Sequence, residues 1–157
     1  LSSTVRVYET AAIQVSGTIS KTSAIPIEIP SVPNYQEYDV MRIYFSSGIR
    51  NSLSPSVSLG ANVDIVLGNV GKSNNGEGIW IMNGENKTDV REIILFRTYF
   101  DSIPFFTFLP KSGSIEVNED GIDPNSGFEI GAFTLKGGSD SYTFTNNIRF
   151  EFIKYDF

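Results

Sequence analysis

The segment from residue 118 to residue 127 gathers side chains that could hold a hard cation. It reads Asn-Glu-Asp-Gly-Ile-Asp-Pro-Asn-Ser-Gly, so carboxylate and amide oxygens recur within a few residues. Oxygens of this kind are the ligands that calcium takes in proteins, and Asp120, Asp123 and Asn125 are the candidate ligands. The spacing does not follow the order of an EF-hand loop, and the same residue types are typical of surface turns. The loop is therefore interpreted either as a calcium site or as a solvated turn.

A second candidate, for phosphate, lies at Gly71, Lys72 and Ser73, which follow an apolar stretch. Phosphate-binding loops end in this way, with backbone N–H groups and a lysine around the phosphates. The full motif also needs a glycine five positions before Gly71, where Val66 stands, and the residues after Ser73 would make a poor helix. We therefore expect a turn between two strands.

The chain has no cysteine and no histidine, which excludes thiolate and imidazole metal ligands and catalytic dyads built on either residue. The remaining acid–base groups favour one kind of enzyme, a β-sandwich glycosidase with two carboxylates facing across a cleft. Glu129 and Glu151 are the candidate pair, because each lies beside aromatic residues. A polar residue between apolar ones is, however, typical of the wet face of a half-buried strand. We expect a protein that is not an enzyme.

Trp80 is the single tryptophan, and it alternates with two isoleucines, so one of these two sets faces away from the main core. If Trp80 faces outward, its ring beside Asn83, Asn86 and Asp89 would suit a sugar, which needs a flat apolar surface and polar groups for its hydroxyls. If it faces inward, it is a core residue whose indole N–H bonds to a carbonyl. Both interpretations stay open at this point.

Aromatic residues make up 13% of the chain, and they are dense between residues 100 and 108. Phe105 and Phe106 are neighbours and must point in opposite directions along a strand, so one of them needs a cover beyond its own sheet. A second subunit would supply that cover. Two more rings lie at the C-terminal end, where chains usually fray unless they are docked. The residues expected at a subunit interface are Phe100, Phe105, Phe106, Phe108, Tyr155 and Phe157.

The elements that must position these residues are strands. Short β-branched and aromatic stretches alternate with Gly, Asn, Ser and Pro clusters about every eight to fifteen residues. This rhythm predicts an all-β fold, an antiparallel two-sheet β-sandwich of the jelly-roll type, with a barrel as the alternative. Residues 1–157 are predicted to form one domain. The predicted strands are 4–8, 12–20, 38–45, 56–59, 63–70, 78–82, 90–100, 105–109, 114–117, 128–135, 142–145 and 147–155.

The segment from residue 88 to residue 100 carries two conflicting signals. Asp89 followed three residues later by Glu92 is a helix-start signature. The residues that follow are mostly β-branched or aromatic, which favours a strand. We predict a strand, with a single helical turn at its start as the alternative.

The last segment shows the strand pattern most clearly. Ile148, Phe150 and Phe152 alternate with Arg149 and Glu151. Because successive side chains of a strand point to opposite faces, this pattern predicts one buried face and one wet face.

The charge balance limits the classes of partner. Twelve Lys and Arg against eighteen Asp and Glu give a net charge of −6, with no basic cluster. Nothing offsets repulsion from nucleic-acid phosphates or from an anionic membrane surface, and no apolar run is long enough to span a bilayer. We expect neither nucleic-acid binding nor membrane insertion. The chain starts at Leu1 without a signal-peptide pattern, so we expect a processed product or an excised piece.

Rich in Ser, Thr and Asn and free of Cys and His, the composition is that of many virion-surface, tail-fibre and cell-surface adhesion modules. We expect a non-catalytic structural or binding module of an extracellular or viral assembly, with no cofactor except calcium in the loop described above. It would form a homo-oligomer, first of all a trimer, and bind sister subunits or a host-surface glycan or protein. The alternatives are a carbohydrate-binding module that uses Trp80 and the β-sandwich glycosidase.

Overall fold

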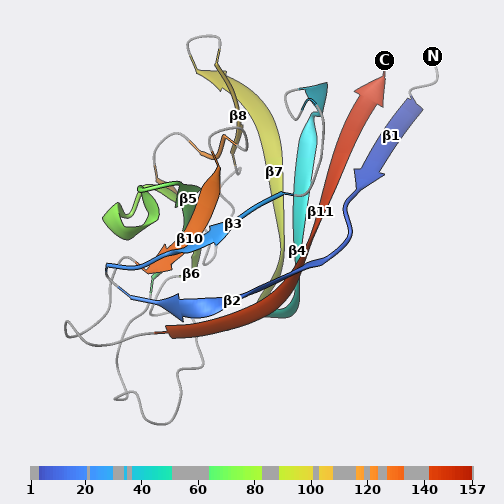
Figure 1. Cartoon of the computed structure of the whole chain (residues 1–157). Helices are drawn as coiled ribbons and strands as arrows, with labels where there is room; N and C mark the ends of the chain where they lie inside the picture. Colours follow the sequence, from blue (N-terminus) through green and yellow to red (C-terminus); the bar gives the residue numbers. More distant parts are fainter. Residues whose placement is uncertain are drawn as a thin grey trace.

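The computed structural model describes residues 4–20, 22–29, 34, 37–50, 64–82, 89–100, 103–107, 116–118, 121–123, 127–132 and 142–156. These residues form two antiparallel sheets and include the 3-10 turn η2 (Ser73–Asn75) (Figure 1). The prediction of an all-β chain is therefore confirmed. The predicted strand 56–59 lies outside the described residues.

The larger sheet has six strands. Their order is β1-β11-β4-β7-β8, and β2 pairs with β11 beside β1. The strands are β1 (Thr4–Glu9), β2 (Ile13–Ile19), β4 (Val40–Arg50), β7 (Asp89–Phe100), β8 (Ile103–Thr107) and β11 (Tyr142–Asp156). The last strand covers two predicted strands, 142–145 and 147–155, which are continuous in the structure.

The smaller sheet has five strands in the order β3-β10-β5-β6-β9. They are β3 (Ile25–Ile27), β5 (Ile65–Asn69), β6 (Gly78–Met82), β9 (Glu116–Asn118) and β10 (Phe128–Ala132). β5 is buried on both faces, because the turn around η2 packs on the side that faces away from the larger sheet.

Four antiparallel strand pairs are nested along the chain. Inside the pair of β1 with β11, they are β2 with β11, β3 with β10, β4 with β7, and β5 with β6. Successive pairs alternate between the larger and the smaller sheet. The chain therefore crosses between the two layers repeatedly, and the core forms between them.

The core consists of aliphatic and aromatic side chains from the facing sides of both sheets. The rings of Phe150 on β11 and Phe128 on β10 meet edge to face, with centroids 5.9 Å apart. At the other end, the centroids of Phe152 and Phe106 are 6.3 Å apart. Phe106 is 2% exposed, so its prediction as an interface residue is wrong. It points inward because β8 continues the larger sheet and Phe106 bridges to Ile122.

The conflicting signals of residues 88–100 are resolved in favour of a strand, because β7 pairs with β4 and β8 along its length. Glu92, the second half of the helix-start signature, does not fold back to cap a helix. Its carboxylate accepts a hydrogen bond from Arg42 Nε at 2.8 Å. A cross-strand partner therefore outweighs the local preference.

β1 and β2 pair one after the other with the same edge of β11, and a bulge separates them. Three residues, 10–12, lie between Glu9 and Ile13, whereas two, 149–150, lie between their partners Glu151 and Ile148. Thr10 is buried at this bulge. Its backbone N–H donates to Phe150 O at 2.9 Å, and its hydroxyl accepts from Phe150 N at 3.1 Å. The side chain thus takes over a bond that the backbone makes in a regular ladder.

Replacing Thr10 with valine should lower the free energy of unfolding by about 1–3 kcal/mol, because the Phe150 N–H would stay buried without an acceptor. Valine has nearly the same shape as threonine, so packing changes little. Thr10→Ser keeps the hydroxyl and should lose clearly less. Urea unfolding followed by tryptophan fluorescence measures both, and equal losses would contradict this role of the hydroxyl.

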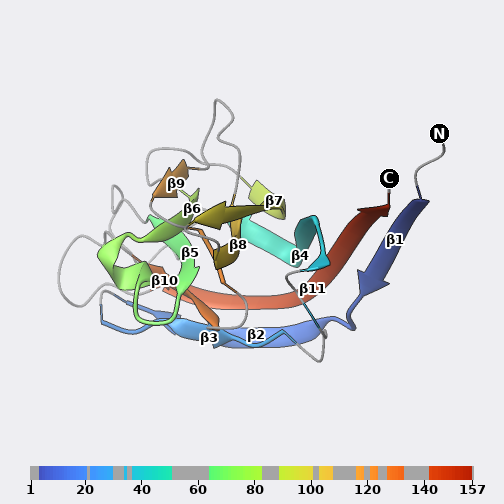
Figure 2. The same cartoon turned by 90° about the horizontal axis from the view of Figure 1, so that it is seen from above.

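The end of the larger sheet that carries both chain termini projects beyond the smaller sheet. Figures 1 and 2 show β1 and the end of β11 running away from β3, β5, β6 and β10 in both views. Thr4 pairs with Asp156, so the two ends of the described chain lie side by side. On β1, side chains of both faces are exposed, Val5 and Val7 on one face and Tyr8 on the other.

Candidate functional site

The exposed large hydrophobic side chains of the described residues gather on the projecting end of the larger sheet. Val5 and Val7 of β1 are each 52% exposed, Phe96 of β7 is 40% exposed and Tyr155 of β11 is 38% exposed. The remaining members on this sheet are Tyr8 and Tyr99, and Val70, in the turn after β5, is the exception.

The strand register joins several of these side chains into one surface. Val7 pairs with Ile153, Ile153 with Val40, and Val40 with Phe96, so one row crosses β1, β11, β4 and β7. Directly paired residues share a face, and this row alternates with the core residues, so it lies on the outer face. Val40 and Ile153 are buried although they are not part of the core cluster. We call Val5, Val7, Val40, Phe96, Ile153 and Tyr155 the apolar strip.

Of the residues predicted at an interface, Tyr155 is the one whose side chain the structure places on an exposed surface. Phe106 lies in the core. Phe108 and Phe157 lie outside the described residues, and Phe100 and Phe105 are described only as backbone positions of β7 and β8. Sequence reasoning missed Val5, Val7 and Phe96, because residues of these types in a strand read as core. The alternating Val-Arg-Val sequence of β1 was the available signal.

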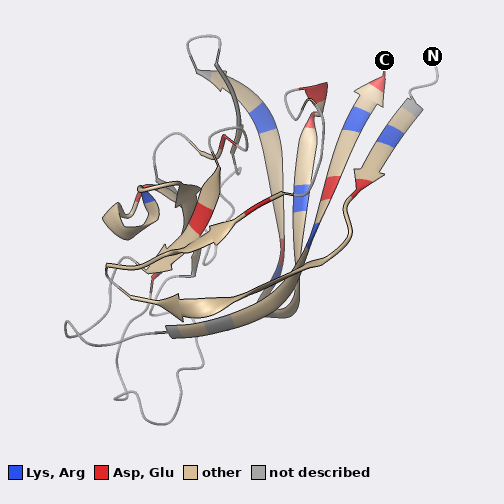
Figure 3. Ribbon diagram, viewed as in Figure 1, with Lys and Arg blue, Asp and Glu red and all other residues tan. Residues whose placement is uncertain are grey.

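Next to the apolar strip, the outer face carries a cluster of paired charges, and Figure 3 shows blue and red bands recurring on β4, β7 and β11. Arg42 lies between two carboxylates, with Nε 2.8 Å from Glu92 Oε1 and Nη1 3.4 Å from Glu151 Oε1. The Arg149 guanidinium stacks over the Tyr44 ring, 4.8 Å from its centroid. Arg42, Glu92 and Glu151 therefore satisfy one another across three strands.

The pKa of two groups in this cluster is displaced. The hydrogen bonds to Glu92 raise the pKa of Arg42 above its ordinary value. Burial raises the pKa of the Tyr44 phenol, and the nearby Arg42 cation only partly opposes this effect. Both groups therefore keep their proton over the whole physiological range.

Stability should respond to pH through Tyr44. The folded state holds the phenolic proton more tightly than the unfolded state, so stability is lost as the pH rises above the ordinary value of 10.0. Between about pH 6 and pH 8 stability should stay flat, because no side chain of this histidine-free chain has an ordinary pKa there. Urea unfolding at several pH values measures both. Tyr44→Phe should reduce the alkaline loss, and an unchanged loss would contradict the assignment.

The Gly71-Lys72-Ser73 turn does hold an anion, but that anion is part of the chain. Glu129 Oε1 accepts hydrogen bonds from Gly71 N at 3.0 Å, from Ser73 N at 3.3 Å and from Ser73 Oγ at 2.7 Å. Lys72 pairs with Glu77, at 3.4 Å between Nζ and Oε2. A phosphate would have to displace this carboxylate, so the turn is built for structure and not for nucleotide binding.

Glu129→Ala should lower the free energy of unfolding by about 2–4 kcal/mol, because three donors lose a charged acceptor at once. Glu129→Gln keeps one acceptor oxygen and should lose about half as much. Chemical denaturation of the three proteins measures the difference. Equal stability of wild type and Glu129→Ala would show that the turn does not depend on this carboxylate.

The structure does not bring Glu129 and Glu151 together. Glu129 lies between Phe128 and Ile130 on β10, and Glu151 lies between Phe150 and Phe152 on β11. Those neighbours fill the core, so each carboxylate points to the outer face of its own sheet. The sandwich core separates the pair, and the cleft geometry that a two-carboxylate glycosidase needs is missing for these residues.

Trp80 faces away from the core. Ile79 and Ile81 are fully buried in the cluster between the sheets, whereas Trp80 is paired with Val66 on the outer face of the smaller sheet and is half-buried. Its indole N–H donates to Gly76 O at 2.7 Å, which ties the turn around η2 to the sheet. Of its predicted neighbours, Asn83 and Asn86 lie outside the described residues, and Asp89 is described only as the first backbone position of β7.

The predicted calcium loop is described in part. Asp123 N donates to Asn69 Oδ1 at 2.9 Å, and Asn69 Nδ2 donates to Gly121 O at 3.3 Å, so Asn69 anchors this loop. Asp120 and Asn125 lie outside the described residues. Within the part of the chain that is described, no group of three or more acidic, Cys or His side chains could hold a metal ion.

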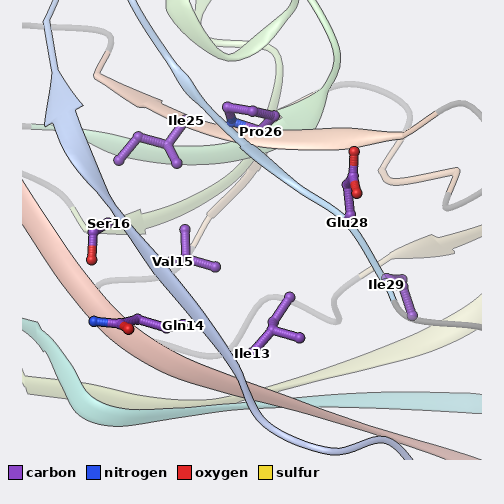
Figure 4. Close-up of a pocket in the computed structure, with 8 residues that line it drawn as sticks. All are labelled: Ile13, Gln14, Val15, Ser16, Ile25, Pro26, Glu28 and Ile29. Atoms are coloured by element: carbon purple, nitrogen blue, oxygen red, sulfur yellow. The ribbon is translucent and has the colours of Figure 1, made fainter.

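An open groove of about 650 Å³ lies between β2 and β3. Figure 4 shows side chains of both segments along it, and its lining is Ile13, Gln14, Val15, Ser16, Ile25, Pro26, Glu28 and Ile29. Glu28 is the one ionisable group of this lining, so the groove offers no acid–base pair.

Searches of protein-family models, of curated proteins and of solved structures return no match to this chain. No helix among the described residues is long and apolar enough to cross a membrane.

Proposed function

We propose that this protein is a non-catalytic structural or binding module of an extracellular or viral assembly, and that it associates with other protein surfaces through the apolar strip. The observation that carries the proposal is the gathering of exposed apolar side chains on one face of the projecting sheet end. Scattered hydrophobic residues are normal on a protein surface, whereas a contiguous apolar patch marks an interaction site.

The proposal includes a jelly-roll fold, which is supported by the nesting of the strand pairs. In a jelly roll, a long antiparallel hairpin is rolled up so that its successive pairs alternate between two sheets. The pairs β2–β11, β3–β10, β4–β7 and β5–β6 follow this scheme, with β1, β8 and β9 added at the edges. Viral capsid proteins and lectins use jelly rolls, and this is fold-level support only.

The surface next to the strip also favours association. The charges of the Arg42 cluster are satisfied within the chain, so they need no ligand and would form a polar rim beside an apolar contact. An interface with an apolar centre and a polar rim is the usual arrangement between protein subunits.

The test is the oligomeric state of the purified chain, measured by light scattering and sedimentation velocity at about 1–100 µM. We expect a concentration-dependent assembly that Phe96→Asp weakens at least about tenfold. The matched control is Val70→Asp, which places the same charge on an exposed apolar residue away from the strip and should leave the assembly intact. A monomer over the whole range would overturn the proposal.

Glycan binding through Trp80 is the second candidate, because its ring lies on the outer face and is half-buried. A carbohydrate-binding module needs an accessible flat ring with polar groups around it. A glycan array with the wild type and with Trp80→Ala tests this function, and Tyr99→Ala, an exposed ring on the other sheet, is the control. Binding that is absent, or that survives Trp80→Ala, would exclude it.

A further inference from the structure

The free edge of β1 is the second feature of the projecting end. β1 is the last strand in the order of the larger sheet, and no described segment pairs with its other edge. At the opposite end of the sheet, β8 is partly covered, because Phe106 and Ile122 exchange both backbone hydrogen bonds at 2.8 Å.

The direction of the backbone groups of β1 follows from its pairing. Thr10 N donates to Phe150 O, so the N–H of Thr10 faces β11. Because the direction alternates along a strand, Arg6 and Tyr8 also turn their backbone groups toward β11. Val5, Val7 and Glu9 turn theirs toward the open edge. A strand with this pattern can accept another strand.

We propose that the strand that completes this edge is β1 of a second copy of the chain, paired antiparallel about a two-fold axis at Val7. This inference rests on the proposed function and names its partner. Val7 then pairs with the second copy's Val7, and Val5 pairs with its Glu9. Each of these pairs uses outward-facing backbone groups on both strands, so both hydrogen bonds of each pair form.

The side chains that lie opposite one another favour this register. Arg6 pairs with Asp156 of its own chain, at 2.9 Å between Nε and Oδ2. With the axis at Val7, it also lies opposite the second copy's Tyr8, and a guanidinium beside an aromatic ring is a favourable pair. With the axis at Arg6, the two Arg6 side chains would lie directly opposite each other, which is unfavourable. A pairing that places Val7 opposite the second copy's Arg6 is also excluded, because it would put side chains of the outer face opposite side chains of the other face.

The outer face gives the second reason for a second copy. In each protomer the row Phe96, Val40, Ile153 and Val7 ends at the open edge. The two-fold axis at Val7 places two such rows end to end, so the two Val7 side chains lie side by side on the outer face and shield each other at the edge. A partner strand without an apolar residue opposite Val7 would not supply this contact.

Proline at position 7 tests the edge. Val7→Pro removes an N–H that points away from β11, so the fold should survive, as proline is tolerated at a free strand edge. We expect the dissociation constant of the dimer to rise at least about tenfold. Val7→Thr keeps the N–H and the branched shape and should change it far less. Circular dichroism and thermal unfolding check that both variants are folded.

Cysteine cross-linking tests the register and does not depend on the proline variant. The chain has no cysteine, so a single introduced thiol can bond only to its copy. Val7→Cys places two Cα atoms about 5.5 Å apart, within the range of a disulfide. Arg6→Cys places its copies on a diagonal at about 7–8 Å, beyond that range. Mild oxidation should link the first variant and not the second.

The outcomes separate the inference from the proposed function. A dimer that Val7→Pro weakens and that Val7→Cys links supports the inference. An assembly that Phe96→Asp weakens but Val7→Pro does not, a threefold assembly, or faster linking of Arg6→Cys overturns the inference and leaves the proposed function standing. A monomer at every concentration overturns both.

Discussion

Gly78→Ala should lower the free energy of unfolding by more than about 3 kcal/mol or prevent folding. Gly78 has φ +131°, a backbone conformation that residues with a side chain rarely adopt. An added Cβ would also lie 2.4 Å from Leu67 O and 2.7 Å from Gly68 Cα. Both contacts are backbone atoms of the neighbouring strand β5, so a rotamer change cannot relieve them. The loss should therefore include both backbone strain and a shift of the β5–β6 pair.

Gly71→Ala is the matched control for this prediction. Gly71 also has a positive φ, +82°, but an added Cβ there would meet nothing within 4 Å. The cost should be limited to the left-handed conformation, about 1–2 kcal/mol. Urea denaturation of both variants measures the two losses. Equal losses would show that the close approach of β5 and β6 near Gly78 does not constrain the fold.

Phe150→Ala should lower the free energy of unfolding by about 3–5 kcal/mol. The side chain of Phe150 is fully buried and meets the Phe128 ring across the two sheets at 5.9 Å between centroids. Removing it leaves a cavity at the contact that joins the layers. β11 is also paired with β1, β2 and β4, so the backbone there has little freedom to close the gap.

Phe96→Ala is the control for the core variant, because Phe96 is the same residue type at an exposed position of the larger sheet. Its truncation should change stability by less than about 1 kcal/mol while weakening association of the chain. Thermal unfolding and light scattering on the two variants give the comparison. A large loss of stability from Phe96→Ala would mean that the apolar strip serves the fold of the monomer and not association.

The two faces of the larger sheet have different tasks. One face holds the sandwich together through residues such as Phe150 and Ile43, which are buried in the core. The other face carries paired charges around Arg42 and, toward the termini, the apolar strip. Variants on the outer face should therefore change the association of the chain and leave its folding intact.

Local pattern alone was sufficient for part of the fold. The alternation of Phe150 and Phe152 with Arg149 correctly predicted a strand with one buried face, because successive side chains of a strand point to opposite sides whatever lies beyond them. Glu151 departs from the pattern. It was expected on the wet face but is buried, because Arg42, distant in sequence, lies over it.

By itself, the sequence determined that the chain is all-β and that the β7 segment is a strand. These properties follow from residue type and from a period of two, which are local. Only the tertiary structure decided that Phe106 lies in the core, that Glu129 is bound by the Gly71–Ser73 turn, and that Val5 and Val7 reach solvent on a projecting sheet end. Those outcomes depend on strand register between residues far apart in the chain, and a pattern of residue types along one strand contains no information about the strand beside it.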